Sequence, residues 1–460
     1  VNIRRVKYML KGMSVAATTL GCKVNQAETD SMLDMLKAAG ANIVEFDEKA
    51  DIYIVNTCSV TNIADKKSRQ MLHRARKMNP DGIVIAAGCY VQSAREILEQ
   101  DEAIDIVISN NKKKSITEIV NDYINVRNNE ENTADKDHEA MEYFVDISRE
   151  TEYEEMGGHV PVGHTRAYVK IQDGCNQFCS YCIIPYVRGR IRSRSQEAIL
   201  AEVSELAEAG IKEVVLTGIH ISSYGKDKNN EGALIELIEA ISKIKGIKRI
   251  RLGSLEPGII TEEFVERISS NSKVCPHFHL SLQSGCDSVL KRMNRKYTCK
   301  QYFEKCDMLR KAYKSPALTT DVIVGFPGES EEEFAETVRY LTELNLYEMH
   351  IFKYSPRKGT VAAAMKEQVA PEIKNERSDV LLKLAHDNKT AYEAQFEGCE
   401  LEVLVEEVVK KDNKTYLRGH TERYMDILID VGDISMPESF VNSFVYLTYT
   451  QNGVNLPLLL

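Results

Sequence analysis

The chain has 460 residues, of which 43% are hydrophobic and 28% charged, with 11 prolines. This composition excludes a disordered, collagen-like or fibrous chain, and the length predicts about three domains. No uncharged apolar run approaches the roughly 18 residues of a membrane-spanning helix, so no membrane association is expected. The net charge of −10 is concentrated in residues 127–155 and 393–460. The remainder is net positive, which is compatible with a nucleic-acid partner.

The first part of the chain, residues 10–126, is predicted to be an α/β domain with a doubly wound parallel sheet. Short apolar segments alternate there with amphipathic ones, which is typical of βα units. Strands are expected at Met13–Thr19, Ile43–Phe46, Asp51–Asn56, Gly82–Ala87 and Ile104–Ile108. Helices are expected between them, for example at Ala27–Ala39 and Ala64–Met78.

Residues 127–160 are acidic, polar and weakly periodic, and we interpret them as a linker. One ordered strand is expected within it, at Tyr143–Ile147. The linker separates the first domain from a longer alternating region.

Residues 161–392 contain six predicted βα units and are expected to form a (β/α)6 partial barrel. Strands are expected at Tyr168–Gln172, Glu213–Thr217, Arg249–Leu252, Phe278–Leu282, Thr319–Val324 and Met349–Lys353. Helices are expected at Gln196–Ala209, Ala233–Lys245, Glu262–Ser270, Lys300–Ala312, Glu331–Glu343 and Glu372–Glu393. In barrels of this kind the chemistry lies at the carboxyl ends of the strands.

The last segment, residues 393–456, has short strands, polar turns and no long helix. This pattern predicts a small five-stranded, all-β barrel resembling oligonucleotide-binding folds.

The strongest chemical signal is the CxxxCxxC sequence formed by Cys175, Cys179 and Cys182. Three thiolates in one loop suit an iron–sulfur cluster, because such clusters prefer cysteine sulfur. A four-iron cluster held by three cysteines leaves one iron free for a substrate or cofactor. The alternative is a structural zinc site with His164 or His220 as the fourth ligand.

A second signal comes from three isolated cysteines, Cys22, Cys58 and Cys89, each just past a predicted parallel strand. The carboxyl ends of parallel strands share one edge of a sheet, so these residues can converge there. Gly21 and Gly88 would let the backbone approach a bulky group. The alternative is three buried structural cysteines.

The cysteines also indicate the compartment. There are 11, an odd number, and they are clustered rather than spaced as a disulfide framework, which favours the cytoplasm over secretion.

The CxxxCxxC loop followed by six βα units resembles the radical S-adenosylmethionine (SAM) superfamily. The three N-terminal cysteines and the terminal β-domain, similar to a TRAM module, resemble the methylthiotransferases within it. The finer resemblance is to the MtaB type, which acts on N6-threonylcarbamoyladenosine at position 37 of tRNA. The segments that carry it are TLGCKVNQAETD, VNTCSVTNIADKKSRQ, GCYVQ and DGCNQFCSYCIIPYVRGRIRSRS.

This resemblance implies two [4Fe–4S] clusters, each held by one cysteine trio. Cys175, Cys179 and Cys182 would hold the cluster that binds and cleaves SAM. Cys22, Cys58 and Cys89 would hold an auxiliary cluster that carries the methylthio group to C2 of the adenine. A flavodoxin-like or ferredoxin-like reductant is implied as a partner. Because an aromatic C–H bond is too strong for side-chain acid–base chemistry, the cofactor must perform this step.

Other SAM contacts are expected from residues at strand ends: Tyr181, Thr217, Gly218, Ser254 and Glu256. Each also has an ordinary reading as a turn or helix-cap residue.

Two basic segments are candidate tRNA contacts, because guanidinium and ammonium groups suit phosphate. One is the arginine ladder Arg188, Arg190, Arg192 and Arg194, and the other is a predicted helix with Lys66, Lys67 and Arg69. The alternative for the helix is a solvated face with ordinary ion pairs.

Three further functional hypotheses remain open from the sequence. Two are methylthiotransferases that act on isopentenyladenosine in tRNA or on a ribosomal-protein aspartate. The third, from another class, is a non-catalytic iron–sulfur or zinc protein that binds RNA.

Overall fold

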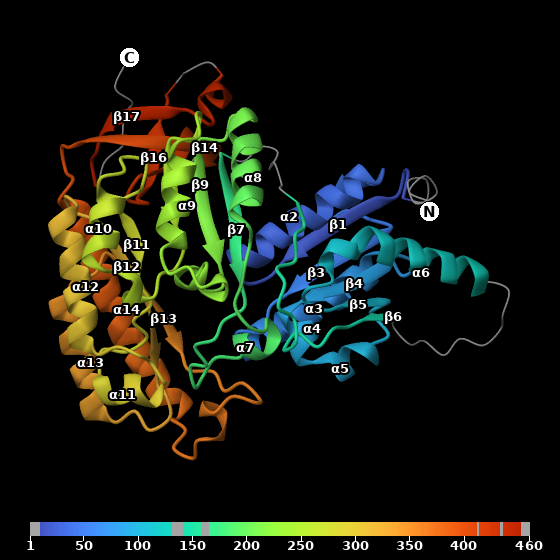
Figure 1. Ribbon diagram of the computed structural model, residues 1–460, viewed down its shortest axis with the longest axis horizontal. Helices are drawn as coiled ribbons and strands as arrows, with labels where there is room; N and C mark the ends of the chain where they lie inside the picture. The colour runs from blue at the N-terminus through green and yellow to red at the C-terminus, as the bar shows by residue number, and fades with distance from the viewer. Residues whose placement is uncertain (1–9, 131–140, 158–164, 412–413, 433–435, 452–460) are drawn as a thin grey trace.

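The computed structural model describes residues 10–130, 141–157, 165–411, 414–432 and 436–451. A parallel sheet near the N-terminus lies beside a curved array of strands and helices, and an antiparallel sheet lies across one end of that array (Figure 1). Within the described ranges no helix is both long enough and apolar enough to cross a bilayer.

The N-terminal sheet is parallel and doubly wound, as predicted, with the strand order β2-β1-β3-β4-β5-β6. Its strands are β1 (Ser14–Thr19), β2 (Asn42–Val44), β3 (Ile52–Thr57), β4 (Ile83–Gly88), β5 (Ile106–Ile108) and β6 (Met141–Tyr143). Its helices are α2 (Lys23–Ala38), α3 (Asn62–Met78), α4 (Cys89–Ser93), α5 (Arg95–Glu99) and α6 (Ile116–Glu130).

Successive residues of the central strands alternate between two hydrophobic cores, one on each face of this sheet. Ile52 and Ile54 of β3 pack into one core, whereas Tyr53 and Val55 pack into the other. Both faces are therefore covered, which explains the continuous apolar runs in the sequence. The chain reverses direction of winding at β1, which pairs with β2 on one side and β3 on the other. Ligands bind at such switch points in open α/β sheets.

The predicted linker is more ordered than its composition suggests. The helix α6 continues to Glu130, and β6 pairs with β5 in parallel as the edge strand of the N-terminal sheet. The strand expected at Tyr143–Ile147 is thus shifted toward the N-terminus and shares only Tyr143 with β6. Residues 131–140 and 158–164 of the predicted linker lie outside the described residues.

The second part is the predicted partial barrel, with parallel strands taken in sequence order. They are β7 (Arg166–Asp173), β9 (Glu213–Gly218), β10 (Arg249–Leu252), β11 (His277–His279), β12 (Ala317–Val324) and β13 (Glu348–Lys353). The ladder is interrupted between β10 and β11, where isolated bridges at Ile250–Val274 and Leu255–Leu280 continue it. The short strand β8 (Arg192–Ser193) runs antiparallel to β7.

Helices cover the outside of the barrel, as the amphipathic segments predict. The long ones are α8 (Gln196–Glu208), α9 (Ala233–Ser242), α10 (Glu262–Ser269), α12 (Cys299–Ala312), α13 (Glu331–Leu344) and α14 (Pro371–Ala394). Two short ones, α7 (Ile184–Val187) and α11 (Asp287–Arg292), lie at the mouth of the barrel. Apolar residues of the strands and helices form the largest core of the molecule.

The C-terminal sheet is antiparallel, with the order β16-β15-β14-β17. Its strands are β14 (Glu400–Lys411), β15 (Lys414–Thr421), β16 (Asp426–Asp430) and β17 (Phe444–Thr448), and a bulge bends β14 between Val405 and Glu407. The prediction was five strands, and four occur among the described residues. Arg249 and Arg251 of β10 donate hydrogen bonds to the backbone carbonyls of His420 and Glu422. The sheet is therefore attached to the amino ends of the barrel strands.

Candidate functional site

The CxxxCxxC loop begins directly after β7, and its backbone is tightly packed. Gly174 has φ of +70°, and a Cβ atom there would lie 1.7 Å from the carbonyl oxygen of Arg190. Only glycine fits this position, which turns the chain sharply from the strand into the loop. The loop is further fixed by a hydrogen bond from the Ser180 amide to the carbonyl of Met293.

The sulfur atoms of this loop lie among hydrogen-bond donors. The Arg295 guanidinium lies 3.3 Å from Sγ of Cys179, and the Gln177 amide lies 3.5 Å from Sγ of Cys175. Burial raises the pKa of Cys175 to about 11 and that of Cys182 to about 12. The thiolate form therefore needs a strong electrophile to stabilise it, and a metal centre supplies that.

The N-terminal trio lies at one edge of the N-terminal sheet. Cys22 precedes α2, Cys58 follows β3, and Cys89 begins α4 directly after β4. Burial, together with the neighbouring Cys89 and Cys22, raises the pKa of Cys58 to about 11. This mutual electrostatic effect indicates that the three sulfur atoms converge, as the strand-end argument predicted.

Two glycines next to these cysteines are too tightly packed for a side chain. Gly21 has φ of +98°, and a Cβ atom there would lie 2.6 Å from Sγ of Cys58. Gly88 has φ of +96°, and its Cβ atom would lie 2.4 Å from the carbonyl oxygen of Thr57. The backbone thus approaches Cys58 closely at Gly21, and at Gly88 it packs against the strand residue that precedes Cys58.

The spacing of the sulfur atoms does not match that of three ligands on one zinc ion. In the part of the chain that the structure describes, neither trio brings its ligand atoms within 4.8 Å of one another. Sulfur ligands on one tetrahedral zinc would be about 3.8 Å apart, given bonds of about 2.3 Å. His220, the described candidate for a fourth zinc ligand, directs Nε2 toward Glu256 at 3.6 Å. His164 lies outside the described residues.

The two trios belong to loops that face each other. The helix α4, which begins at Cys89, packs against α7, which follows Cys182. On the other side, Arg357, which follows β13, donates hydrogen bonds to Ser59 and Asp65 beside Cys58. Figure 1 shows α7 between the barrel and the N-terminal sheet. The carboxyl ends of both sheets therefore open toward a shared space.

Arg188 connects the two parts of this site. Its side chain is fully buried, and its Nε lies 3.2 Å from Sγ of Cys89. The other nitrogens donate to Glu28 of α2 and Asp173 of β7. Although burial alone would raise it, Arg188, Lys113 and Lys170 hold the pKa of Glu28 well below its usual value. The group is a buried network of compensating charges.

The prediction that the arginine ladder faces RNA is therefore wrong for three of its four members. Arg188 lies in the network above, and Arg192 donates to the backbone carbonyls of Arg188 and Arg190. Arg194 is buried and pairs with Glu155 and Glu202. Each of these side chains is at most 5% exposed, so none presents a free cation to a phosphate.

The remaining basic candidates are exposed. Arg190 lies with its guanidinium 4.5 Å from the ring centroid of Phe178. Lys66 and Lys67 project from the solvent side of α3, the helix that follows Cys58. Arg69 on the same helix is exposed and donates a hydrogen bond to the Tyr90 hydroxyl. These four side chains remain candidates for RNA contact.

The expected SAM contacts lie around the mouth of the barrel. Glu256 pairs with Arg295 at 2.9 Å, and Arg295 in turn contacts the Cys179 sulfur. Tyr181 packs beside Phe326 and Tyr354. Thr217 and Gly218 end β9, where Thr217 is buried, and Ser254 is exposed. Their roles toward SAM stay predictions.

Several residues of the site were missed in the sequence. Arg295, Glu28, Lys113 and Lys170 pair with residues that are mostly distant along the chain, so no local motif reveals them. The available signal for Lys170 was a single cation within the apolar strand sequence AYVKIQD, because a charge at a buried position requires a partner.

Comparison with known proteins agrees with this geometry. Residues 169–341 match the model of the radical SAM superfamily, and residues 14–109 match the uncharacterized protein family UPF0004. The threonylcarbamoyladenosine tRNA methylthiotransferase MtaB of Bacillus subtilis is 39% identical over 90% of each chain. The tRNA-2-methylthio-N(6)-dimethylallyladenosine synthase of Thermoanaerobacter pseudethanolicus is 35% identical over 92% of this chain and 88% of its own.

The fold is also similar to that of a solved structure. The radical SAM methyltransferase TsrM of Kitasatospora setae matches 75% of this chain and 77% of its own, with a TM-score of 0.55 and 14% identity. At this identity the likeness concerns the fold alone. The relatives and family models together show that the chain belongs to the radical SAM methylthiotransferase family. It is a transferase that uses SAM and [4Fe–4S] clusters.

Proposed function

We propose that this enzyme transfers a methylthio group to C2 of N6-threonylcarbamoyladenosine at position 37 of tRNA. Three relatives named as threonylcarbamoyladenosine tRNA methylthiotransferases, at 37–39% identity over 90% of this chain, support the assignment. The observation that carries the proposal is the pair of cysteine trios at facing strand ends, because methylthiolation needs both a SAM site and a sulfur carrier.

Each trio has a distinct proposed role. Cys175, Cys179 and Cys182 hold the cluster that binds SAM, with Glu256, Tyr181, Thr217, Gly218 and Ser254 as its neighbours. Cys22, Cys58 and Cys89 hold the auxiliary cluster. When bound, SAM and its cluster supply the one-electron chemistry that an aromatic C–H bond requires.

The protein's own residues orient these groups. The Arg295 guanidinium donates to the Cys179 sulfur and pairs with Glu256. The Arg188 guanidinium donates to the Cys89 sulfur and is fixed by Glu28 and Asp173. Each trio thus has one arginine that withdraws charge from a ligand sulfur and fixes its direction.

Partners and domain organisation follow from the same assignment. Exposed Arg190, Lys66, Lys67 and Arg69 contact the tRNA backbone, and a flavodoxin-like or ferredoxin-like protein supplies electrons in the cytoplasm. The functional domains are residues 10–126, 161–392 and 393–456, joined by the segment 127–160.

Nucleoside mass spectrometry of tRNA from a deletion strain tests the substrate. Loss of the methylthio mark from threonylcarbamoyladenosine, restored by the wild-type chain and not by Cys58→Ala, supports the proposal. Loss from dimethylallyladenosine instead would assign the other substrate. Anaerobic reconstitution should give about eight irons per chain and SAM-dependent release of 5′-deoxyadenosine. Zinc alone, with no deoxyadenosine, would indicate a non-catalytic protein.

A further inference from the structure

A lysine next to the auxiliary trio extends toward the barrel. Lys23 follows Cys22 directly and begins α2. Its ammonium lies 5.7 Å from the ring centroid of Tyr168 on β7 and 5.9 Å from that of Tyr424. Tyr424 belongs to the turn between β15 and β16. Lys23 therefore contacts the barrel and the C-terminal sheet at once.

Lys23 has no acidic partner among the described residues, and the one carboxylate that acts on its pKa is that of Glu213. Glu213 is occupied by Arg251 at 2.7 Å, and Glu406 by Arg166 at 2.9 Å. These two neighbouring arginines are thus neutralised, whereas the ammonium of Lys23 lies against ring faces.

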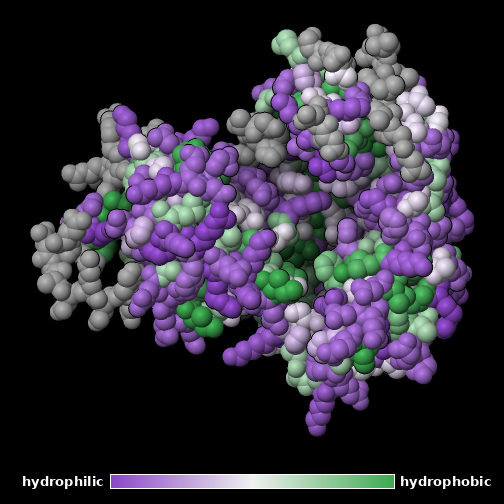
Figure 2. Space-filling model, turned by 180° about the vertical axis from the view of Figure 1, so that it is seen from behind, coloured by the Kyte–Doolittle hydropathy of each residue, from purple (hydrophilic) through white to green (hydrophobic). Residues whose placement is uncertain are grey.

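Lys23 lines the hollow between the N-terminal sheet and the barrel. Its side chain is accessible to solvent, yet burial is the main cause that lowers its pKa. Solvent accessibility and a pKa lowered by burial occur together when a side chain lines a hollow. Figure 2 shows the molecule hollowed between the lobe of the N-terminal sheet and the barrel. Cys22 has the same combination of accessibility and a pKa raised by burial.

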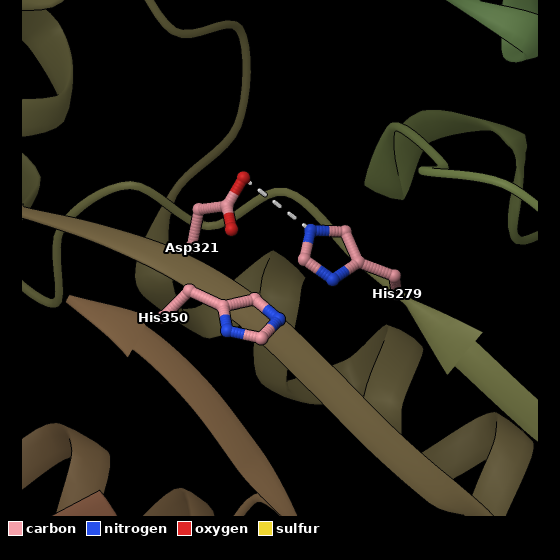
Figure 3. A group of neighbouring side chains, drawn as sticks. All are labelled: His279, Asp321 and His350. Carbon is pink, nitrogen blue, oxygen red and sulfur yellow. Dashed lines mark ion pairs between the residues drawn. The ribbon is translucent and has the colours of Figure 1, made fainter. Parts of the chain in front are cut away.

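Histidines form another part of the wall of this hollow. The ring of His277 packs 5.2 Å from that of Tyr424, which is also the ring that Lys23 approaches, and His279 stacks on His350 with ring centroids 5.9 Å apart. His277 Nδ1 and His279 Nε2 are buried nitrogens without a hydrogen-bond partner in the described part of the chain. Figure 3 shows His279, Asp321 and His350 on three neighbouring strands, with their side chains on the same face.

Register explains this grouping, because Asp321 of β12 pairs with His350 of β13, and His279 of β11 pairs with Thr319 of β12. The ligand atoms of His279, Asp321 and His350 lie within 4.8 Å of one another, and Asp321 lies 3.5 Å from Nε2 of His279. A zinc ion would need nitrogen and oxygen ligands about 3.3 Å apart. The 3.5 Å spacing of Asp321 and His279 is close to this value, so metal binding by the group is an outcome of the test below.

We infer that Lys23, beside the rings of Tyr168 and Tyr424, binds the free carboxylate of the threonylcarbamoyl substituent on the substrate adenine. This inference rests on the proposed function and adds the residue that distinguishes the substrate. The auxiliary trio must reach C2 of the adenine, and the N6 substituent lies on the same six-membered ring. A residue adjacent to Cys22 is therefore well placed to contact that substituent.

Electrostatics gives the site its selectivity. A carboxylate would neutralise the unpaired ammonium and accept a charge-assisted hydrogen bond from it. A dimethylallyl group in the same place would remove water from the ammonium without replacing that interaction, which is costly. Lys23 thus both favours the acidic substituent and disfavours the apolar one.

Anticodon stem-loop RNAs test this inference with the reconstituted holoenzyme. One RNA carries threonylcarbamoyladenosine, the second its carboxamide, in which the acid is neutral, and the third dimethylallyladenosine. Lys23→Met should weaken binding of the acid about 10- to 100-fold, as expected for loss of a charged hydrogen bond, and change binding of the carboxamide little. Lys23→Arg should retain most of the preference for the acid. Lys37→Met, an exposed lysine at the other end of α2, is the matched control.

Iron content and SAM cleavage in Lys23→Met should match the wild type, which separates substrate binding from damage to the cluster. His350→Phe, a second variant remote from the cysteines, should weaken binding of the acid several-fold. Equal losses for acid and carboxamide would overturn the inference while leaving the proposed function intact. So would calorimetric zinc binding that His350→Phe abolishes, together with an unchanged preference for the acid. Methylthiolation of the dimethylallyl RNA alone by the wild type would instead contradict the proposed function.

Discussion

The Nε atom of Arg188 lies 3.2 Å from the sulfur of Cys89, although 99 residues separate them. Arg188 belongs to the segment that follows the CxxxCxxC loop, whereas Cys89 belongs to the N-terminal sheet. Its remaining nitrogens are held by Glu28 and Asp173. One guanidinium therefore fixes the position of the auxiliary trio relative to the barrel.

Replacing Arg188 should destabilise the protein strongly. Arg188→Met leaves Glu28 and Asp173 without one of their cations in a buried site, which typically costs about 3–5 kcal/mol. Arg149→Met removes an exposed arginine from a surface ion pair, so it should cost less than about 1 kcal/mol. Denaturant unfolding of the anaerobic holoproteins measures both. An Arg188 variant as stable as the Arg149 variant would contradict the role of the network.

The two trios should be separable by mutation. Cys179→Ala should abolish 5′-deoxyadenosine formation and product, because SAM loses its cluster. Cys58→Ala should leave SAM cleavage largely intact and give no methylthiolated product. Each variant should lose about four irons, and Cys399→Ala, at an exposed cysteine, should lose none. Identical iron contents in the Cys58 and Cys399 variants would remove the N-terminal trio from metal binding.

The exposed cations should account for part of the salt dependence of tRNA binding. Replacing Lys66, Lys67 and Arg190 with alanine should reduce the slope of log K against log salt by about 0.7–0.9 for each phosphate that the protein no longer neutralises. Lys245→Ala, at an exposed lysine of the barrel, is the control. A triple variant with the slope of the wild type would place the RNA elsewhere.

Lowering the pH should protonate Glu333 and remove its stabilising interactions with Arg292, Ser288 and Ser330. Hydrogen bonds from Arg292, at 2.6 Å, and from Ser288 and the Ser330 amide lower the pKa of Glu333 to about 2. An unfolded glutamate has a pKa of about 4.3. The contribution of Glu333 is therefore fully present above about pH 4.3 and is lost as the pH falls toward 2.

Accordingly, Glu333→Gln should lower the melting temperature at pH 7, and the difference from the wild type should begin to shrink between pH 5 and pH 4. Glu304→Gln, at an exposed position on α12, should show a small and constant difference. A Glu333 difference that grows on acidification would contradict the assignment. Thermal unfolding of the holoprotein at a series of pH values provides the measurement.

The strand-end argument predicted the cysteine positions because it depends on local sequence. Parallel strands with short loops bring their carboxyl ends together, so Cys22, Cys58 and Cys89 needed no knowledge of the remaining fold. The burial of Arg188 and Arg194 was not predictable in this way. Their partners Glu28, Glu155 and Glu202 lie 160, 39 and 8 residues away, so an arginine run that looks like a phosphate-binding surface is internal.

The same limit applies to the linker and to Lys23. Composition predicted a weakly structured linker, but pairing with β5 stabilises residues 141–143 as an edge strand. The lack of an acidic partner for Lys23 could not be predicted from the sequence, because it depends on Arg251 pairing with Glu213. The contacts of Lys23 form only when the N-terminal sheet, the barrel and the C-terminal sheet pack together.

The side chain of Tyr424 extends from the C-terminal sheet and contacts residues of the barrel strands. Its ring lies near the guanidinium groups of Arg166 and Arg251 and packs with His277. Deleting this sheet would therefore expose Arg166 and Arg251 of the barrel to solvent, in addition to removing the TRAM-like domain. Exchanging the C-terminal sheet between relatives should change which nucleoside is accepted. Such chimeras need to carry the Tyr424 turn together with the barrel that it contacts.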